Sequence, residues 1–178
     1  GLPLTLETST TNTKIYMAKK LTITTELTVF ESLQELPQSI QELMHKAQKA
    51  RERAYAPYSR FKVGAAILLA NGEVVTGNNQ ENAAFPSGLC AERVAAFYAG
   101  ATYPGVAFQA IALTVRSLNH EVTTPTPPCG ACRQSLAEYE TNQKSSMSLY
   151  FMGETGNVVQ ANAIKDLLPL RFDSSYLK

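Results

Sequence analysis

The first regular pattern in the chain covers residues 33–54, where apolar side chains recur every three or four positions. This spacing is typical of an amphipathic α-helix with one buried face. Pro37 fits the first turn of such a helix, where its missing N–H leaves no hydrogen bond unmade. Because the residue before a proline avoids helical backbone angles, we expect the helix to end near Pro57.

An uninterrupted apolar run, residues 61–70, follows this helix and predicts a buried strand. Asn71 and Gly72 then predict a two-residue turn of the primed type, because such turns require residues that tolerate positive φ angles. Residues 73–78 are therefore expected to return as the antiparallel partner of the strand.

The remaining chain alternates between predicted helices and strands. One helix is expected over residues 90–98 and is ended by Gly100, since glycine readily takes the left-handed conformation that closes a helix. A second helix is expected over residues 129–140, after an irregular proline-rich segment, residues 123–128. Strands are predicted at residues 111–115, 148–152 and 158–160. This alternation predicts an α/β fold with a mixed central sheet flanked by helices.

Length and charge narrow the possible classes of function. With 178 residues, the chain has room for one domain with a substantial core. Its net charge of +1, without a basic stripe, argues against a nucleic-acid partner. No apolar run is long enough to span a bilayer, so no membrane partner is expected. The odd number of cysteines, 3, favours a reducing and therefore cytoplasmic compartment.

Residues 1–16 form a threonine-rich segment that precedes Met17. The segment lacks the cationic start, apolar core and small-residue cleavage site of a secretory signal. We therefore interpret it as an upstream extension or an added segment. The fold and the catalytic function are assigned to a single domain, residues 17–178.

The cysteines lie in two short motifs. Cys129 and Cys132 are separated by two residues, and Cys90 lies well upstream of them. Three thiolates would hold one zinc ion and leave its fourth position open, which is the arrangement of a catalytic site. Glu92 follows the first of these ligands by two residues and is placed to move protons at the metal, although such an acid could also merely favour a helix N-terminus.

Other interpretations of the cysteines are open at this point. They could be small buried side chains, or two of them could form a disulfide as in thioredoxin-like redox motifs. A structural zinc site would need a histidine as the fourth ligand, and only His45 and His120 are available. Because His45 lies in the predicted first helix and His120 in a polar loop, surface positions are expected for both.

Two arginines adjoin the cysteine motifs. The predicted helices begin at the cysteines, and a helix N-terminus stabilises thiolates. Three thiolates around Zn²⁺ leave a net negative charge that a nearby cation would offset. Arg93 and Arg133 are candidates for hydrogen-bonding the ligand sulfurs, although either could be an ordinary solvent-facing helix residue.

The two cysteine motifs, Cys-Ala-Glu-Arg at residues 90–93 and Pro-Cys-Gly-Ala-Cys-Arg-Gln at residues 128–134, resemble the zinc signature of cytidine deaminases. The similarity is to the small homotetrameric branch that uses three cysteines. Two further blocks agree with it, residues 58–66 and 79–85, and the resemblance extends from about the first predicted helix to Phe172. It implies a three-layer cytidine-deaminase-like fold, one zinc ion per subunit and a homotetramer.

The resemblance also implies contacts with the substrate. Asn79 and Glu81 match the pair that holds the ribose 3′-hydroxyl in the family. Phe61 matches an aromatic residue of the base pocket, with core packing at the start of a strand as the alternative. Ala91 would offer backbone contacts to the pyrimidine, and Glu92 would bind its N3.

Two aromatic residues are implied at contacts between subunits. Phe85 stands where the family often has a tyrosine, and in tetramers that residue reaches a neighbouring site. Phe172 resembles a C-terminal aromatic residue that closes the pocket of a neighbouring subunit. Pro169 and Leu170 replace a proline–glycine pair of the family, so the detailed subunit contacts are expected to differ.

These patterns predict zinc-dependent hydrolytic deamination of cytidine and 2′-deoxycytidine to uridine and 2′-deoxyuridine, with release of ammonia, in pyrimidine salvage. The alternative substrate is a cytosine nucleoside antibiotic of the blasticidin S type, although Asn79 and Glu81 favour a nucleoside with a free ribose. Deoxycytidylate would need cationic phosphate ligands, for which the sequence offers no candidate. The alternative outside the enzymes is a non-catalytic, zinc-stabilised binding protein with the same fold.

Overall fold

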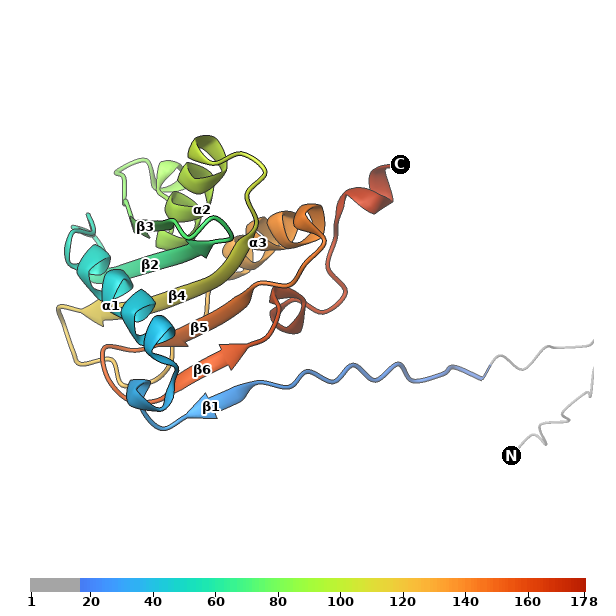
Figure 1. Cartoon of the computed structure of the whole chain (residues 1–178), viewed down its shortest axis with the longest axis horizontal. Coiled ribbons are helices and arrows are strands. Elements are labelled where there is room, and N and C mark those ends of the chain that lie inside the picture. The colour runs from blue at the N-terminus through green and yellow to red at the C-terminus, as the bar shows by residue number, and fades with distance from the viewer. Residues whose placement is uncertain (1–16) are drawn as a thin grey trace, which may run out of the picture.

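Six strands form one sheet in the computed structural model, which describes residues 17–178, and their order is β1-β6-β5-β4-β2-β3 (Figure 1). The strands are β1 (Thr28–Phe30), β2 (Phe61–Leu69), β3 (Val74–Asn78), β4 (Phe108–Ser117), β5 (Ser148–Met152) and β6 (Val158–Ala161). The β4–β5 pair is parallel, and the other pairs are antiparallel. The predicted mixed sheet is therefore confirmed. Our interpretation of residues 1–16 lies outside the described residues.

Helices cover both faces of this sheet. They are α1 (Gln38–Glu52), α2 (Ala91–Thr102) and α3 (Gly130–Gln143), with short 3₁₀ turns at η1 (Leu33–Glu35), η2 (Phe85–Ser87), η3 (Ile164–Leu167) and η4 (Ser174–Leu177). The α1 helix packs on one face, and α2 and α3 pack on the other. Because side chains alternate along a strand, Ala65 belongs to the core beneath α2 and α3, whereas Ala66 belongs to the core beneath α1.

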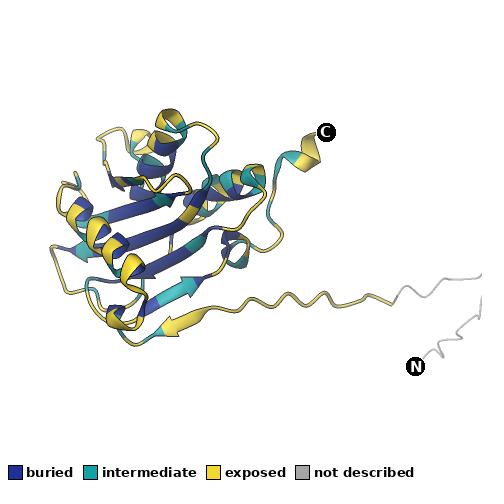
Figure 2. Ribbon diagram, viewed as in Figure 1, coloured by how far each residue is buried: buried dark blue, intermediate teal, exposed yellow. Residues whose placement is uncertain are grey.

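The central strands are enclosed by these layers, whereas the outer helix surfaces face solvent (Figure 2). The β4 strand is buried at most positions on both of its faces, which explains the uninterrupted apolar run at residues 110–113. Among the helices of residues 17–178, none combines the length and the apolar character that crossing a membrane requires.

The first helix begins later than predicted. It starts at Gln38, and the preceding residues 33–35 form the separate turn η1. Leu36 lies before Pro37 and takes an extended conformation with ψ of 156°, because the proline ring disfavours helical angles in the residue before it. Pro37 therefore caps the helix from outside its first turn.

The hairpin β2–β3 is confirmed, but its predicted turn type is wrong. The amide of Gly72 donates to the Leu69 carbonyl at 3.0 Å, and the Leu69 amide donates to the Glu73 carbonyl at 2.9 Å. The loop thus holds three residues, of which Gly72 alone has a positive φ, 87°. This arrangement fits a type I turn followed by a left-handed glycine, rather than a primed turn with two positive φ angles.

Gly100 does not end α2, contrary to the prediction. It lies inside the helix, which continues to Thr102. A Cβ atom at this position would lie 3.0 Å from the Tyr139 hydroxyl of α3. The glycine therefore allows the two helices to approach closely, and its sequence signal reflects packing rather than helix termination.

The other elements differ from the predictions mainly in their ends. Residues 148–152 form β5 as predicted, and β6 extends one residue further than expected. The β4 strand is longer than the expected residues 111–115 at both ends. The edge strand β1 was not predicted from the sequence, because it contains only three residues.

Candidate functional site

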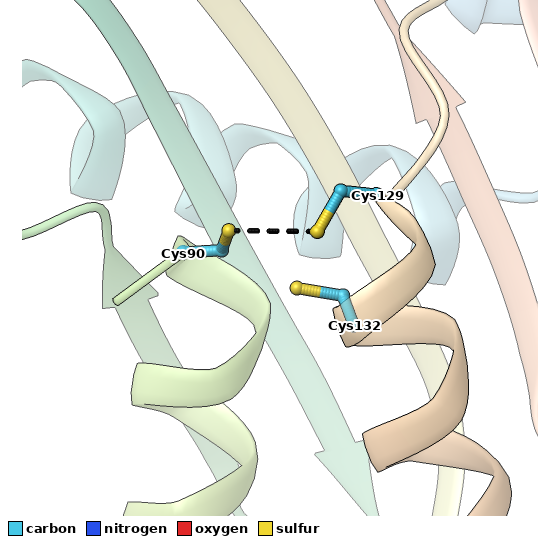
Figure 3. Close-up of side chains that lie close together, drawn as sticks. All are labelled: Cys90, Cys129 and Cys132. Carbon is cyan, nitrogen blue, oxygen red and sulfur yellow. Dashed lines mark hydrogen bonds between the residues drawn. The ribbon is translucent and has the colours of Figure 1, made fainter. Parts of the chain in front are cut away.

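The three cysteines are positioned by the first turns of two helices. Cys90 is the N-cap residue of α2, and Cys129 is the N-cap residue of α3. Cys132 follows in the first turn of α3, and Figure 3 shows the three side chains pointing toward one another. The prediction that the cysteines lie at helix N-termini is therefore confirmed.

The spacing of the sulfur atoms fits a single zinc ion. The Cys90 and Cys129 Sγ atoms lie 3.7 Å apart, and all three sulfurs lie within 4.8 Å of one another. A tetrahedral site with Zn–S bonds of about 2.3 Å has sulfur–sulfur edges of about 3.8 Å. Among residues 17–178, no histidine or carboxylate joins this group, so three protein ligands leave a fourth position open.

The alternative interpretations of the cysteines do not agree with this geometry. All three thiols are free, and a separation of 3.7 Å is far longer than a disulfide bond. Cys132 is buried, but Cys129 is exposed and Cys90 is intermediate, so the three do not share one apolar core. The histidines do not complete a structural site within the described part of the chain.

A close contact with β3 fixes the start of α2. A Cβ atom on Gly77 would lie 2.6 Å from both the Ala91 carbonyl oxygen and the Ala95 amide nitrogen. Real Cβ atoms do not approach backbone atoms so closely, so only glycine allows α2 to lie directly on the strand here. This contact sets the position of Cys90, which immediately precedes the helix.

Arg93 stabilises negative charge on the sulfur cluster. Its Nη2 donates a hydrogen bond to the Cys90 sulfur at 3.4 Å. Hydrogen bonds from the Cys132 thiol and from Arg93 lower the pKa of Cys90 to about 5. The hydrogen bond to Cys90, together with burial, raises the pKa of Cys132. The cluster thus favours at least one thiolate at neutral pH even without a metal ion.

Glu92 is a buried carboxyl group beside the sulfurs. Only 3% of the residue is exposed, and it lines a cavity next to the cysteines. Burial raises the pKa of Glu92 to about 7, with a further contribution from the negative charge of Cys90. A carboxyl group in this state can both accept and donate a proton near neutral pH.

A cavity of about 780 Å³ opens above these groups. Four apolar side chains line it: Phe61 and Val63 of β2, and Leu113 and Val115 of β4. By their positions along the strands, all four lie on the face of the sheet that α2 and α3 cover. Cys90, Cys129, Glu92 and Arg93 line it as well. Its size and its few polar groups on an apolar wall are typical of a small-molecule site.

Asn79 and Glu81, which the family resemblance implies as ribose contacts, both line this cavity. The Asn79 amide bridges to β2, because its Oδ1 accepts from the Val63 amide at 2.8 Å and its Nδ2 donates to the Phe61 carbonyl at 2.8 Å. Glu81 accepts from the amides of Tyr58 and Ser59 through its Oε1. Burial acts to raise the pKa of Glu81, but hydrogen bonds from the Ser59 side chain and from these two amides outweigh it and lower the pKa.

The two aromatic residues implied at subunit contacts lie in different places. Phe85 is 74% exposed, lines the cavity and packs edge-on against Tyr58 at a ring separation of 5.7 Å. Phe172 does not line this cavity. It is 55% exposed and stacks on Tyr176, and its carbonyl accepts from Gln134.

Ala91 and Arg133 do not line the cavity either. Ala91 is fully buried in the first turn of α2, between the cysteine and Glu92. Arg133 donates to the carbonyls of Pro128 at 2.9 Å and Leu167 at 3.0 Å. The structure therefore gives Arg133 carbonyl partners instead of the expected sulfur, and it braces the loop that leads into Cys129.

Several cavity residues were not predicted as site residues. Tyr58, Thr126 and Pro127 line the cavity, and the sequence places the last two only in an irregular proline-rich segment. In the sequence, only one feature indicates that Thr126 and Pro127 lie near the site: their proline-rich segment ends directly before the metal ligand Cys129. Leu113 and Val115 look like ordinary core residues in the sequence, and only the sheet register brings them beneath the site.

Comparisons with known proteins agree with this geometry. Residues 37–147 match the family described as the cytidine and deoxycytidylate deaminase zinc-binding region. A cytidine deaminase of Halalkalibacterium halodurans is 40% identical over 134 residues, which is 74% of this chain and 92% of that protein. One from Sporosarcina psychrophila is 39% identical over 139 residues, with coverages of 78% and 94%.

Solved structures show the same similarity. The crystal structure of a Burkholderia pseudomallei cytidine deaminase superposes with a TM-score of 0.64 at 41% identity and covers 74% of this chain and 97% of its own. A cytidine deaminase structure from Mycobacterium tuberculosis superposes with a TM-score of 0.57 at 33% identity, with coverages of 75% and 97%.

Proposed function

Given that the chain belongs to the cytidine deaminase family, we propose that it hydrolyses cytidine and 2′-deoxycytidine to uridine and 2′-deoxyuridine with release of ammonia. The observation that carries this proposal is the convergence of three cysteine sulfurs beside a cavity that Cys90, Cys129 and the buried Glu92 line. A metal ion held by these cysteines and the proton-transferring group Glu92 would thus both be close to this cavity.

The chemistry divides between the metal ion and Glu92. Cys90, Cys129 and Cys132 would hold a zinc ion, which would supply the Lewis acidity that makes a water molecule nucleophilic at neutral pH. Glu92 accepts one proton from the water that attacks C4 of the pyrimidine and delivers it to ring N3. It then takes the second proton of that water, from the hydroxyl group now on C4, and passes it to the amino group, which leaves as ammonia. Its raised pKa suits both directions of transfer.

Binding of the nucleoside involves the groups around the cavity. Asn79 and Glu81 hold the ribose hydroxyls, and Phe61 packs against the base. Glu81 is fixed through one carboxylate oxygen by two backbone amides, so its other oxygen can face a ligand. The Ala91 backbone, in the first turn of α2, offers hydrogen bonds to the edge of the pyrimidine.

The charges of the cavity favour a nucleoside over a nucleotide. Its charged lining residues are Glu81, Glu92 and Arg93, and the arginine is already bound to the Cys90 sulfur. A 5′-phosphate would therefore meet carboxylates without a free cation among these lining residues. We expect cytidine monophosphate to be a poor substrate.

The active form proposed here is a cytoplasmic homotetramer that acts in pyrimidine salvage, with residues 17–178 as its single catalytic domain. The exposed Phe172 supports pockets shared between subunits, because it lies outside the cavity of its own chain and is free to meet another. Phe85, at the rim of its own cavity, is placed where a neighbouring subunit can also touch it.

A substrate panel tests the proposal. Zinc-loaded protein is mixed separately with cytidine, 2′-deoxycytidine, cytidine monophosphate and blasticidin S, and released ammonia is measured. Rapid, chelator-sensitive release from the two nucleosides supports the proposal. Release from blasticidin S alone would identify the antibiotic deaminase instead, and no release from any of them would favour the non-catalytic binding protein.

A further inference from the structure

The N-terminal arm, residues 17–27, is the largest apolar feature that the site does not use. It continues the direction of β1 away from the rest of the molecule (Figure 1) and is exposed along its whole length (Figure 2). Four large aliphatic side chains of the arm and β1 face solvent: Leu21 at 77% exposure, Ile23 at 48%, Leu27 at 41% and Val29 at 59%. Such exposure is costly unless another surface covers it.

Aliphatic and polar side chains alternate along the arm, as they do in a β-strand. Aliphatic residues occupy the odd positions 21, 23, 27 and 29, whereas threonine or glutamate occupies every even position from 22 to 28. The Thr25 hydroxyl donates to the Asp166 carbonyl at 2.6 Å, which directs this odd-numbered face toward η3. Neither proline nor glycine interrupts residues 17–36. This composition favours an extended strand.

The backbone of the arm is free to pair. β1 is an edge strand bonded on one side to β6, and the backbone groups of residues 17–27 make no hydrogen bond within the described part of the chain. Long, flat, apolar edges invite pairing with another chain, and proteins normally protect them with charges, prolines or bulges. This edge has none of these devices between Leu21 and Val29 apart from Glu26.

The pattern of the arm is symmetric about Thr25, and we propose that residues 19–31 pair antiparallel with the same segment of a second copy of this chain across a two-fold axis at Thr25. In this register Leu21 lies opposite Val29, and Ile23 lies opposite Leu27, so every aliphatic side chain meets another.

Charge agrees with the same register. Lys19 of one copy lies opposite Glu31 of the other, on the same face as the aliphatic pairs. On the opposite face Thr22 lies opposite Thr28, and Glu26 lies opposite Thr24. A shift by one residue would place aliphatic side chains opposite polar ones, so the self-complementary register is specific. Pairing joins the two sheets of six strands through their β1 edges.

A second copy is favoured over an unrelated partner because the segment is complementary to itself. The arm also lies outside residues 37–147, which match the catalytic family, so its pairing is a separate property from the deaminase site. An isolated pair of strands is marginally stable. Here each arm extends an existing sheet, which supplies the stability that an isolated hairpin lacks.

Disulfide trapping in the full-length, zinc-loaded protein tests the register. Opposed residues of antiparallel strands have Cα atoms about 4.5 to 5.5 Å apart, within the range that a disulfide bridges. Thr25→Cys lies on the two-fold axis and is expected to link two chains under mild oxidation, which doubles the 19.4 kDa band on a non-reducing gel. Wild-type protein controls for the three native cysteines.

Ile23→Cys is the matched control on the same face. Its counterpart in the other copy would be four residues out of register, about 13 Å away along the strand, so this variant alone should stay unlinked. Coexpression of Ile23→Cys with Leu27→Cys should restore the linked dimer. Absence of linkage in Thr25→Cys would overturn the proposal, since the arm then contacts its own chain or a different protein. Equal linkage in the Ile23→Cys variant alone would overturn it too.

Discussion

The Arg93 guanidinium donates to the Cys90 sulfur at 3.4 Å, and this contact couples a fixed positive charge to the metal site. The two residues are three apart at the start of α2, so one helical turn brings their side chains together. The Nε atom of Arg93 is buried and has no hydrogen-bond partner within residues 17–178, so the hydrogen bond to the Cys90 sulfur comes from Nη2. We expect this contact to offset the negative charge of three thiolates around one zinc ion.

Replacing Arg93 should weaken zinc binding. In Arg93→Ala the sulfur loses both a hydrogen bond and a neighbouring cation, and we expect zinc affinity to fall about 10- to 100-fold. Competition with a chromogenic chelator measures this change. Arg133→Ala is the control, because that guanidinium donates to carbonyl oxygens and its loss should alter zinc affinity far less. Unchanged zinc affinity and pH–rate profile in Arg93→Ala would refute charge compensation.

Two glycines near the cysteines should respond oppositely to substitution by alanine. In Gly77→Ala the new methyl group meets backbone atoms of α2 at 2.6 Å, and we expect a loss of about 1–3 kcal/mol in the free energy of unfolding. Because the helix start must shift, zinc affinity should fall as well. Urea unfolding and metal titration of the same preparation measure the two effects.

The control is Gly130→Ala, inside the cysteine motif itself. No atom lies within 4 Å of a Cβ atom at this position, and Gly130 is the first residue of α3. Stability and zinc affinity should therefore stay the same or rise slightly, because alanine favours a helix. A strong defect in Gly130→Ala, with a mild one in Gly77→Ala, would contradict this account of the metal site.

Glu140 should be the main attachment of the C-terminal segment to α3. Its buried carboxylate accepts from the amides of Met147, Ile164 and Lys165 and pairs with Arg171 at 3.4 Å. Glu140→Ala leaves buried amides without partners, and we expect a loss of about 3 kcal/mol in the free energy of unfolding. Urea unfolding measures it.

Glu138→Ala, on the exposed side of the same helix, should change the free energy of unfolding by less than about 0.5 kcal/mol. Equal stabilities of the two variants would show that the carboxylate of Glu140 does not secure the segment. The segment carries Phe172, so its release should also impair any contact that this residue makes with a neighbouring subunit.

The sequence predicted those parts of the structure that depend on local chemistry. The cysteines, Glu92 and Arg93 come together because each lies at the N-cap or in the first turn of a helix, as the sequence predicts. Arg133 looks equivalent to Arg93 in the sequence. Its carbonyl partner on Leu167 lies 34 residues away, and only the fold reveals it.

Backbone details were harder to predict, because one residue type serves different purposes. Gly100 carries the signal of a helix end, yet it is a packing position against Tyr139. Asn71 and Gly72 signal a primed turn, but the strand register adds one residue to the loop. Leu113 and Val115 became cavity residues only through their pairing with β2.

The central claim is that Glu92 transfers protons at a zinc site that deaminates cytidine. The most direct measurement is the loss of ultraviolet absorbance of cytidine with wild-type protein and Glu92→Gln, with zinc content determined on the same samples. Because general acid–base catalysis contributes about 10²–10⁴-fold, we expect Glu92→Gln to keep its zinc and lose turnover by at least that factor. Near wild-type turnover in zinc-loaded Glu92→Gln would contradict the account.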